Sequence, residues 1–392
     1  MHMFPAAEKI SADLIEWRHY LHRHAEVSFQ EKATAAFIVE KLKGWGLDVR
    51  HPVAKTGVVA RLGRGKPVIA LRADMDALPL TEATDLPYAS QNPGVMHACG
   101  HDAHVAALLG VARLMRDNPP PRGSVKFIFQ PSEEKVGPDG HSGASLMVAE
   151  GALEDVDAIV GLHVWSTRPA GQVCFSPGPQ MAAAGAFEAV ITGFGGHGAS
   201  PHRAVDPVVL AAQAVLNMQA IVSRKLNPID TGVVTIGVIK GGSEHNIIPE
   251  SVELHGTLRA FKDEVFEEIK KEIARCLDTV KPLGGDYTLS FDTGYPVVHN
   301  HPGLTQLVQE VAVQAFGADN VKPGEPVMGS EDFSFYANQV PGCFIRLGAG
   351  FSDRENPDHH NPRFDIDESV LPLATGLLDA AARRYLSDPV EP

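Results

Sequence analysis

The stretch "KPVIALRADMD", residues 66–76, decides the fold class, because it is an apolar run that ends in two carboxylates. Continuous apolar strands are typical of sheets that are buried on both faces, as parallel sheets are. The segments "SVKFIFQP" (124–131) and "DAIVGLHVW" (157–165) have the same character. Between the first two strands lies "HVAALLGVARLM" (104–115), whose apolar residues have helical spacing. Strands that alternate with helices predict an α/β fold with a mostly parallel sheet covered by helices.

The pattern changes near residue 182 and returns after residue 297. The segment between reads strand, helix, strand, strand, helix, strand, at residues 186–194, 207–224, 232–242, 251–261, 263–280 and 286–296. This order is the split βαβ pattern of a small, ferredoxin-like α+β domain. A strand at 342–350 and a helix at 371–386 then resume the first pattern. We therefore predict a discontinuous catalytic domain, residues 1–181 and 297–392, interrupted by an inserted domain at 182–296.

Composition limits the class of protein. The chain has 392 residues, which is enough for two domains with large cores. Its 34 basic and 48 acidic residues give a net charge of −14, which disfavours binding to nucleic acid and to anionic membranes. The N-terminus lacks the apolar core of a signal peptide, and no run approaches the roughly 20 apolar residues of a membrane span. The four cysteines are scattered without a CxxC pair, so we expect free thiols and a cytoplasmic location.

Side chains that bind metals or protons follow several of the predicted strands. In α/β sheets, ligands bind beyond the carboxyl ends of the strands. Such groups occupy five segments: Asp74 and Asp76, Cys99 and His101, Glu133 and Glu134, His163, and His359 and His360. Each residue alone is more often a structural or solvated group. Their joint occurrence at one edge of one sheet instead predicts a metal or catalytic site.

The residue types narrow the chemistry of that site. Cysteine, histidine and glutamate together suit zinc and related divalent transition metals. One metal needs about four ligands, and more candidates than that are present, which favours two metals that share a water or hydroxide. The adjacent pair Glu133 and Glu134 can then divide two tasks, one as a metal ligand and the other as a free general base.

A set of motifs in the chain occurs in a recognisable order. They are "RADMDALP" (72–79), "MHACGHDAHVAALLG" (96–110), "QPSEE" (130–134), "GLHVW" (161–165), "GGHGASPH" (195–202), "HNIIP" (245–249), "GTLRAF" (256–261), "GSEDFSFY" (329–336) and "HHNPRFDID" (359–367). In this set the sequence resembles the dinuclear metallo-amidohydrolases, which include hippurate hydrolases, bacterial aminoacylases and auxin-conjugate hydrolases. This group is a branch of the aminoacylase and carboxypeptidase superfamily. The resemblance covers nearly the whole chain and implies a zinc-peptidase-like catalytic domain.

The resemblance implies hydrolysis of the amide bond of N-acyl amino acids by two divalent metal ions, with zinc, manganese, cobalt and nickel all left open. It places the metal ligands on Cys99, His101, Glu134, His163 and His360. It makes Glu133 the general base and Asp76 the residue that orients the site. His197 would stabilise the developing oxyanion from the inserted domain, often across a homodimer. Asn246 and Arg259 would hold polar groups of the substrate, with Arg259 either on its carboxylate or in an ion pair within the inserted domain.

Two details of the ligand region depart from or extend the family pattern. Relatives in the peptidase branches carry a histidine ligand where this chain has Asp74, which puts zinc-peptidase behaviour in doubt. The pair Cys99 and His101 would supply ligands instead, as in the amidohydrolase branch. We expect Asp102 and His104 to support these ligands from behind.

Three alternatives remain open from the sequence. "GFGGHG" (193–198) matches a dinucleotide-binding motif, but Pro201 and Pro207 delay the following helix and the acidic strand end is missing. A metallo-carboxypeptidase or dipeptidase would need an acidic group for the substrate's free ammonium. A non-catalytic metal-binding protein would need no free base, such as Glu133, beside a ligand.

Overall fold

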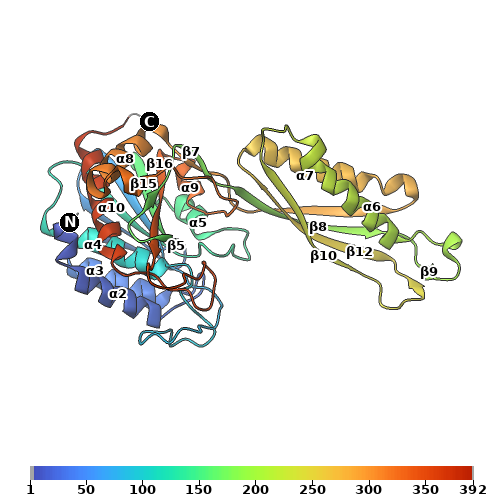
Figure 1. Ribbon diagram of the computed structural model, residues 1–392, viewed down its shortest axis with the longest axis horizontal. Coiled ribbons are helices and arrows are strands. Elements are labelled where there is room, and N and C mark those ends of the chain that lie inside the picture. The colour runs from blue at the N-terminus through green and yellow to red at the C-terminus, as the bar shows by residue number, and fades with distance from the viewer. Residues whose placement is uncertain (1–3, 391–392) are drawn as a thin grey trace. The chain divides into compact units, whose positions relative to one another are not determined.

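A computed structural model describes residues 4–390 and divides the chain into two compact units (Figure 1). The first unit runs to Gln180 and continues with Val298–Glu325 and from Asp332 onward. The second unit comprises Met181–Val297 and the short segment Pro326–Glu331. The sequence placed that short segment in the catalytic domain. It groups with the second unit because the backbone N–H of Ala182 donates to the carbonyls of Val327 and Gly329, at 3.1 and 3.0 Å.

The first unit is built on an eight-stranded sheet in the order β1-β2-β4-β3-β5-β16-β6-β15. Its four central strands are parallel: β4 (Ser124–Gln130), β3 (Val68–Asp74), β5 (Ala158–Pro169) and β16 (Gly342–Gly350). Antiparallel pairs join β1 (Asp48–Val53) to β2 (Gly57–Gly63), β2 to β4, and β16 to β6 (Val173–Cys174), while β15 (Val321–Lys322) runs parallel to β6. The predicted mostly parallel sheet is therefore confirmed.

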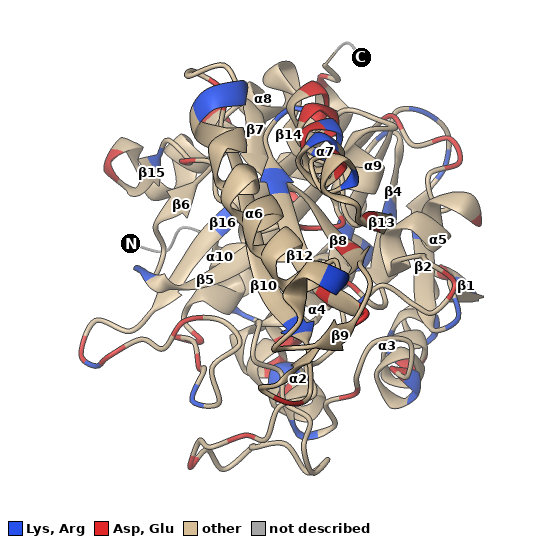
Figure 2. Cartoon of the chain, turned by 90° about the vertical axis from the view of Figure 1, so that its right-hand side faces the viewer, with Lys and Arg blue, Asp and Glu red and all other residues tan. Residues whose placement is uncertain are grey.

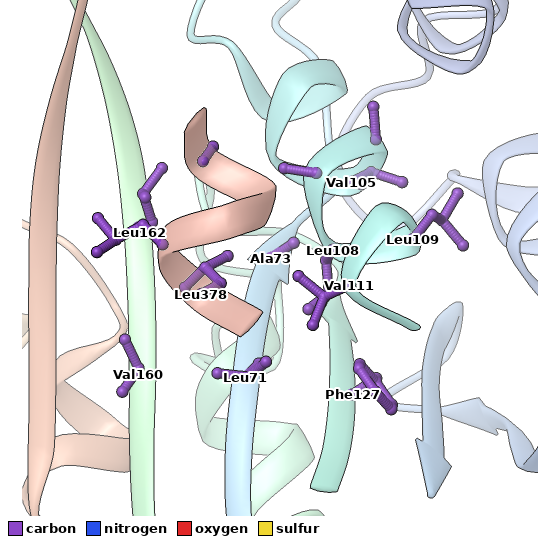
Figure 3. Packing of buried hydrophobic residues seen from close by; sticks show 14 of the residues in the cluster. Leu71, Ala73, Val105, Leu108, Leu109, Val111, Phe127, Val160, Leu162 and Leu378 are labelled. Atoms are coloured by element: carbon purple, nitrogen blue, oxygen red, sulfur yellow. The ribbon is translucent and has the colours of Figure 1, made fainter. Parts of the chain in front are cut away.

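Burial on both faces explains the apolar strands. Every residue of β3, β4 and β16 is buried. One face packs on α4 (His101–Asp117) and α10 (Val370–Ser387), where Figure 3 shows Leu71 and Ala73 of β3 between Leu378 of α10 and Leu108 of α4. The other described helices of this unit are α1 (Pro5–Glu8), α2 (Ser11–Arg23), α3 (Lys32–Gly44), α5 (Gly143–Ala149), α8 (Pro302–Phe316) and α9 (Ser334–Ala337).

The second unit has the predicted β-α-β-β-α-β order. Its antiparallel sheet has the order β10-β12-β8-β13, with bounds Gly232–Gly241, Ser251–Ala260, Ala183–Thr192 and Asp286–Thr293. Buried and exposed residues alternate along β8, so one face of the sheet is apolar. The helices α6 (Pro207–Ala220) and α7 (Asp263–Asp278) cover that face (Figure 1). A separate ribbon pairs β9 (Gly196–His197) with β11 (Ile247–Ile248). This arrangement is ferredoxin-like, as predicted.

Two observations bear on the expected location of the protein. The four cysteines are free thiols. Among the described helices, none combines the length and the apolar character that crossing a bilayer requires. The cytoplasmic location stays a prediction.

A buried ion network ties three distant parts of the first unit together. Arg18 of α2 is fully buried, and its Nε donates to Asp102 at 3.1 Å. Its two terminal nitrogens donate to Glu368 at 2.8 Å and to Asp365 at 3.2 Å. Beside it, Nδ1 of His22 lies 2.8 Å from Asp102. The network thus joins α2, the first turn of α4 and the segment before α10.

The charge of His22 makes stability depend on pH. Burial lowers the pKa of His22, but hydrogen bonds to Asp102 and Glu82 outweigh burial and raise that pKa to about 9. The stabilisation is therefore complete below the pKa of an unfolded histidine, about 6.5, and is lost as pH rises through about 9. We expect the free energy of unfolding of the metal-free protein to fall by roughly 3 kcal/mol across this window, at about 1.4 kcal/mol per pKa unit.

Urea titrations at several pH values, followed by tryptophan fluorescence, would measure this loss, because all three tryptophans lie in the first unit. His22→Gln should flatten the dependence, whereas the exposed control His245→Gln should keep it. Equal slopes in the wild type and His22→Gln would contradict the assignment.

Candidate metal centre

The structure brings together all five side chains predicted as metal ligands. The donor atoms of Cys99, His101 and His163 lie within 4.8 Å of one another, and so do those of Cys99, Glu134 and His360. The two groups overlap at the sulfur of Cys99, which lies 3.5 Å from Nε2 of His163. Two overlapping sets of sulfur, nitrogen and oxygen donors suit a pair of divalent transition metals.

The imidazoles are held in the tautomer that a metal requires. Nδ1 of His101 donates to the backbone carbonyl of Asp76 at 2.8 Å, and Nδ1 of His163 donates to the carbonyl of Val164 at 2.6 Å. Nε2 of each ring therefore faces the cluster. Burial lowers the pKa of His101, but Asp74 and Asp76 outweigh burial and raise that pKa to about 10, so a bound cation would displace a proton from this Nε2. Nε2 of His101 is buried and has no hydrogen-bond partner among the described residues. A bound cation would satisfy this nitrogen, so the residues present fit a metal.

The turn between Cys99 and His101 depends on Gly100. Its φ of 88° lies in the left-handed region, and a Cβ at this position would stand 2.3 Å from a methyl group of Val164. The turn starts α4 at His101, three residues earlier than predicted. His101 therefore stands in the first helical turn, where the helix fixes its direction.

Asp76 holds the loop that carries the two glutamates. Its carboxylate oxygens accept the backbone N–H groups of Glu133 and Glu134, both at 3.1 Å, and the hydroxyl of Ser28 at 2.6 Å. Burial raises the pKa of Asp76, but hydrogen bonding to His101 and to Ser28 outweighs it and lowers that pKa. Asp76 is thus an anion that fixes the positions of both glutamate backbones.

Two residues behind this loop were not predicted from the sequence. Glu31 accepts the backbone N–H of Ser132 at 2.9 Å and the hydroxyl of Thr56 at 2.6 Å. Ser28 binds Asp76 directly. Both precede α3 in "SFQEKA" (28–33), a stretch whose composition is that of an ordinary helix start. Only the fold brings these residues to the loop.

The residues expected behind the ligands take separate roles. Nδ1 of His104 lies 2.5 Å from Asp74, and its Nε2 accepts the backbone N–H of Val164 at 2.9 Å. Because both nitrogens of His104 are occupied, the geometry favours a supporting role for His104 over metal ligation. Asp74 is also paired with Arg72 at 2.7 Å. Asp102 does not support the ligands directly, since its carboxylate binds Arg18 and His22.

The adjacent histidines His359 and His360 also take different roles. Nε2 of His359 lies 3.0 Å from the carbonyl of Val164, and its Nδ1 lies 3.1 Å from Asp358. Nε2 of His360 instead lies 3.2 Å from Glu134. The φ of His360 is 62°, a strained conformation for a residue with a side chain and one typical of functional sites. The geometry therefore favours His360 over His359 as the ligand.

The cluster holds protons that a cation would displace. Burial, and then the carboxylates Glu134 and Glu133, raise the pKa of the Cys99 thiol well above its ordinary value. Burial, and then His104, lower the pKa of His163 well below its ordinary value, so this imidazole is neutral. A bound cation would compensate the charge of a thiolate at Cys99.

His163 lies within strand β5 and not at the strand end, where the sequence predicts it. The strand β5 continues to Pro169, because β16 pairs with it that far. The pairing of β5 with β3 ends earlier, at Arg72 and Gly161. His163 therefore lies just beyond the edge that β3 shares with β5, and this edge is where the other donors lie.

The remaining predicted residues belong to the second unit. His197 pairs with Ile247 on the β9–β11 ribbon, and the carbonyl of Asn246 accepts the N–H of Gly198 at 2.8 Å. His197 and Asn246 thus line one shallow pocket. Arg259 lies on β12, and its guanidinium donates to the carbonyl of Leu258 at 2.9 Å. Among residues 4–390, Arg259 has no carboxylate partner, so the ion pair that was its alternative role is not found.

Asp76→Asn tests the support of the glutamate loop. The amide nitrogen of asparagine cannot accept a hydrogen bond, so one of the two loop N–H groups loses its partner. We expect the affinity for a divalent metal to fall about 10- to 100-fold, as it does when groups that support ligands are removed. Calorimetric titration of the chelator-stripped protein measures this affinity. The exposed control Asp139→Asn should bind like the wild type, and equal binding by Asp76→Asn would refute the role.

Known proteins are similar to this chain over most of its length. The model of the family described as peptidase family M20/M25/M40 matches residues 70–384. The chain is 41% identical over 301 residues to the N-acyl-L-amino acid amidohydrolase of Geobacillus stearothermophilus, covering 75% of this chain and 80% of that protein. It is 38% identical over 386 residues to the IAA-amino acid hydrolase ILR1-like 4 of Arabidopsis thaliana, covering 95% and 87%.

A solved structure is similar along the whole chain. It is a Bacillus subtilis protein described as a dinuclear metal binding peptidase from the M20 family, with a TM-score of 0.83 and 32% identity. The match covers 97% of this chain and 99% of that one. The predicted resemblance is confirmed, and the chain belongs to peptidase family M20/M25/M40.

Proposed function

We propose that the protein hydrolyses the amide bond of N-acyl amino acids and releases a carboxylic acid and a free amino acid. The observation that carries this proposal is the position of Glu133. Its carboxylate lies within 4.8 Å of the donor atoms of His101 and Glu134, while Glu134 also groups with Cys99 and His360. A second carboxylate beside a ligand carboxylate is the arrangement that metal-assisted hydrolysis needs for its general base. The names of the amidohydrolase and the amino acid hydrolase among its relatives support the same reaction.

Two divalent cations would be held by the predicted ligands, which are Cys99, His101, Glu134, His163 and His360. Such cations polarise a carbonyl oxygen and lower the pKa of water. The choice among zinc, manganese, cobalt and nickel stays a prediction, because ligand affinity and cellular supply both decide it.

Glu133 supplies the proton transfers. Its side chain is nearly buried, and its backbone is held by Asp76. In this position Glu133 takes a proton from the attacking water and then delivers it to the nitrogen of the leaving amino acid. A buried base is well suited to both steps, because it keeps the proton from bulk solvent.

The second unit would contribute the groups that recognise the substrate. Nδ1 of His197 accepts the N–H of Ala199 at 3.0 Å, so its Nε2 carries the proton and can donate to a developing oxyanion. Arg259 has only neutral acceptors around its half-buried guanidinium. This unpaired charge supports the role of Arg259 in binding the carboxylate of the amino acid. Asn246, beside His197, would bind a further polar group.

Glu133→Gln tests the proposed base. We expect turnover of N-acetyl-methionine and hippurate to fall about 10²- to 10⁴-fold, the usual contribution of general acid–base catalysis. The metal content, measured by elemental analysis, should stay at about two ions per chain. The exposed control Glu16→Gln on α2 should keep full activity. Full turnover by Glu133→Gln would overturn the mechanism, and cleavage of dipeptides alone by the wild type would favour the peptidase alternative.

We also propose that the second unit joins two copies of the chain. The helix α6 carries no charged residue (Figure 2). It exposes the side chains of Val208, Val209 and Leu216. The strand β10 is an edge strand of its sheet and exposes Val238 and Ile239. An uncharged helix face and an open apolar edge strand are typical of surfaces that pair with another chain.

Leu216→Arg tests the dimer. We expect this variant to be monomeric by light scattering, because it introduces a charge into the apolar surface. Leu283 is also exposed, so Leu283→Arg serves as the matched control and should remain dimeric. If His197 acts across subunits, the monomer should also lose activity. A fully active monomer would refute that role.

A further inference from the structure

The first unit buries three arginines, and one of them lacks a counter-ion. Arg18, Arg72 and Arg346 are the largest of the fully buried side chains. Arg18 is paired with three carboxylates, and Arg72 is paired with Asp74 and Asp332 at 2.7 and 3.0 Å. Arg346 is only 2% exposed, yet no carboxylate of residues 4–390 lies within ion-pair distance of it. The exception needs an explanation, because arginines are almost never fully buried unless they are paired.

The contacts of Arg346 leave part of its guanidinium unused. Nη2 donates to the backbone carbonyl of Glu325 at 2.6 Å, whereas Nη1 is buried without a hydrogen-bond partner. The guanidinium carbon lies 5.5 Å from the centre of the Trp165 ring. An aromatic face attracts a cation but does not neutralise it.

Arg346 lies close to the metal centre. It is paired with His163 across the parallel strands β16 and β5, so both side chains project from the same face of the sheet. The Trp165 ring that faces the guanidinium lies 5.7 Å from the His163 ring. One aromatic ring therefore separates the unpaired cation from a proposed metal ligand.

A second arginine without a counter-ion lies on the same strand as Trp165. Nε of Arg168 is buried without a partner, and within the described chain this residue also has no ion pair. Burial, and then the charge of Arg168, lower the pKa of Arg346, against smaller opposing effects of Cys174 and Glu325. Two cations that repel each other and share no anion form an incomplete site.

We propose that Arg346, assisted by Arg168, binds a second carboxylate of the substrate, so that the enzyme prefers dianionic N-acyl amino acids. The planar fork of a guanidinium matches a carboxylate. The carboxylate lies either on the acyl chain, as in half-amides of dicarboxylic acids, or on the side chain of an acidic amino acid. The inference rests on the proposed function. In it, Arg259 binds the α-carboxylate that all N-acyl amino acids share, and Arg346 binds the second carboxylate.

Matched substrate pairs test the preference. N-succinyl-methionine is compared with N-butyryl-methionine, and N-acetyl-glutamate with N-acetyl-glutamine, so that each pair differs mainly in charge. We expect the wild type to prefer the charged member of one pair at least about tenfold in kcat/KM, and that pair identifies the source of the carboxylate. The ratio should fall to about one in Arg346→Met and recover in part in Arg346→Lys. The exposed control Arg64→Met should keep the wild-type ratio.

Thermal stability separates binding from a structural role. Arg346→Met removes a buried charge without a partner, so its Tm should equal or exceed that of the wild type, whereas Arg18→Met should lower the Tm. Succinate should raise the Tm of the metal-loaded wild type and leave that of Arg346→Met unchanged. The inference fails if neither pair shows a preference, if Arg346→Met keeps the ratio, or if its Tm falls as far as that of Arg18→Met. Inactivity on every N-acyl amino acid would refute the proposed function instead. The effect of succinate on the Tm of the wild type and of Arg346→Met would then test whether Arg346 binds a carboxylate.

Discussion

Asp76 lies just beyond the end of strand β3, and its carboxylate binds the loop that follows the neighbouring strand β4. It accepts the backbone N–H groups of Glu133 and Glu134 while its own carbonyl fixes the ring of His101. Because β3 and β4 are parallel neighbours, their carboxyl ends meet, and this short bridge is enough to order the donors on both sides. The positions of the proposed base Glu133 and of the proposed ligands Glu134 and His101 thus depend on Asp76, whose buried carboxylate is stabilised by hydrogen bonds.

The sequence predicts those strands and helices whose pattern of apolar residues matches their burial in the folded protein. β3 and β4 are apolar throughout because both of their faces are covered, and this is visible without the structure. The hairpin of β1 and β2 was not predicted, because "DVRHPV" (48–53) is largely exposed and has no apolar pattern. His163 was placed at a strand end because the length of β5 is set by its pairing with β16, a partner about 180 residues away.

The same limit applies inside the candidate site. His101 and His104 are three residues apart on α4 and share one face, whereas Asp102 is rotated by about 100° toward α2. Residue type alone could not separate these roles, since Asp102 stands one position and His104 three positions after the proposed ligand His101. Arg346 illustrates a second kind of limit. In "GCFIRLGAG" (342–350) the sequence shows an arginine within an apolar strand, but whether it has a counter-ion depends on segments that fold over it from elsewhere.

The insertion of the second unit has a consequence for synthesis of the chain. The strand β5 is complete at Pro169, but its parallel neighbour β16 begins only at Gly342. At about 5 to 20 residues per second, the ribosome leaves this apolar edge without its neighbour for roughly ten to thirty seconds. Throughout that interval His360 and the acidic partners of Arg18 near α10 are also missing. The nascent chain is then prone to pair with other strands, and it should depend on chaperones until its last fifty residues emerge.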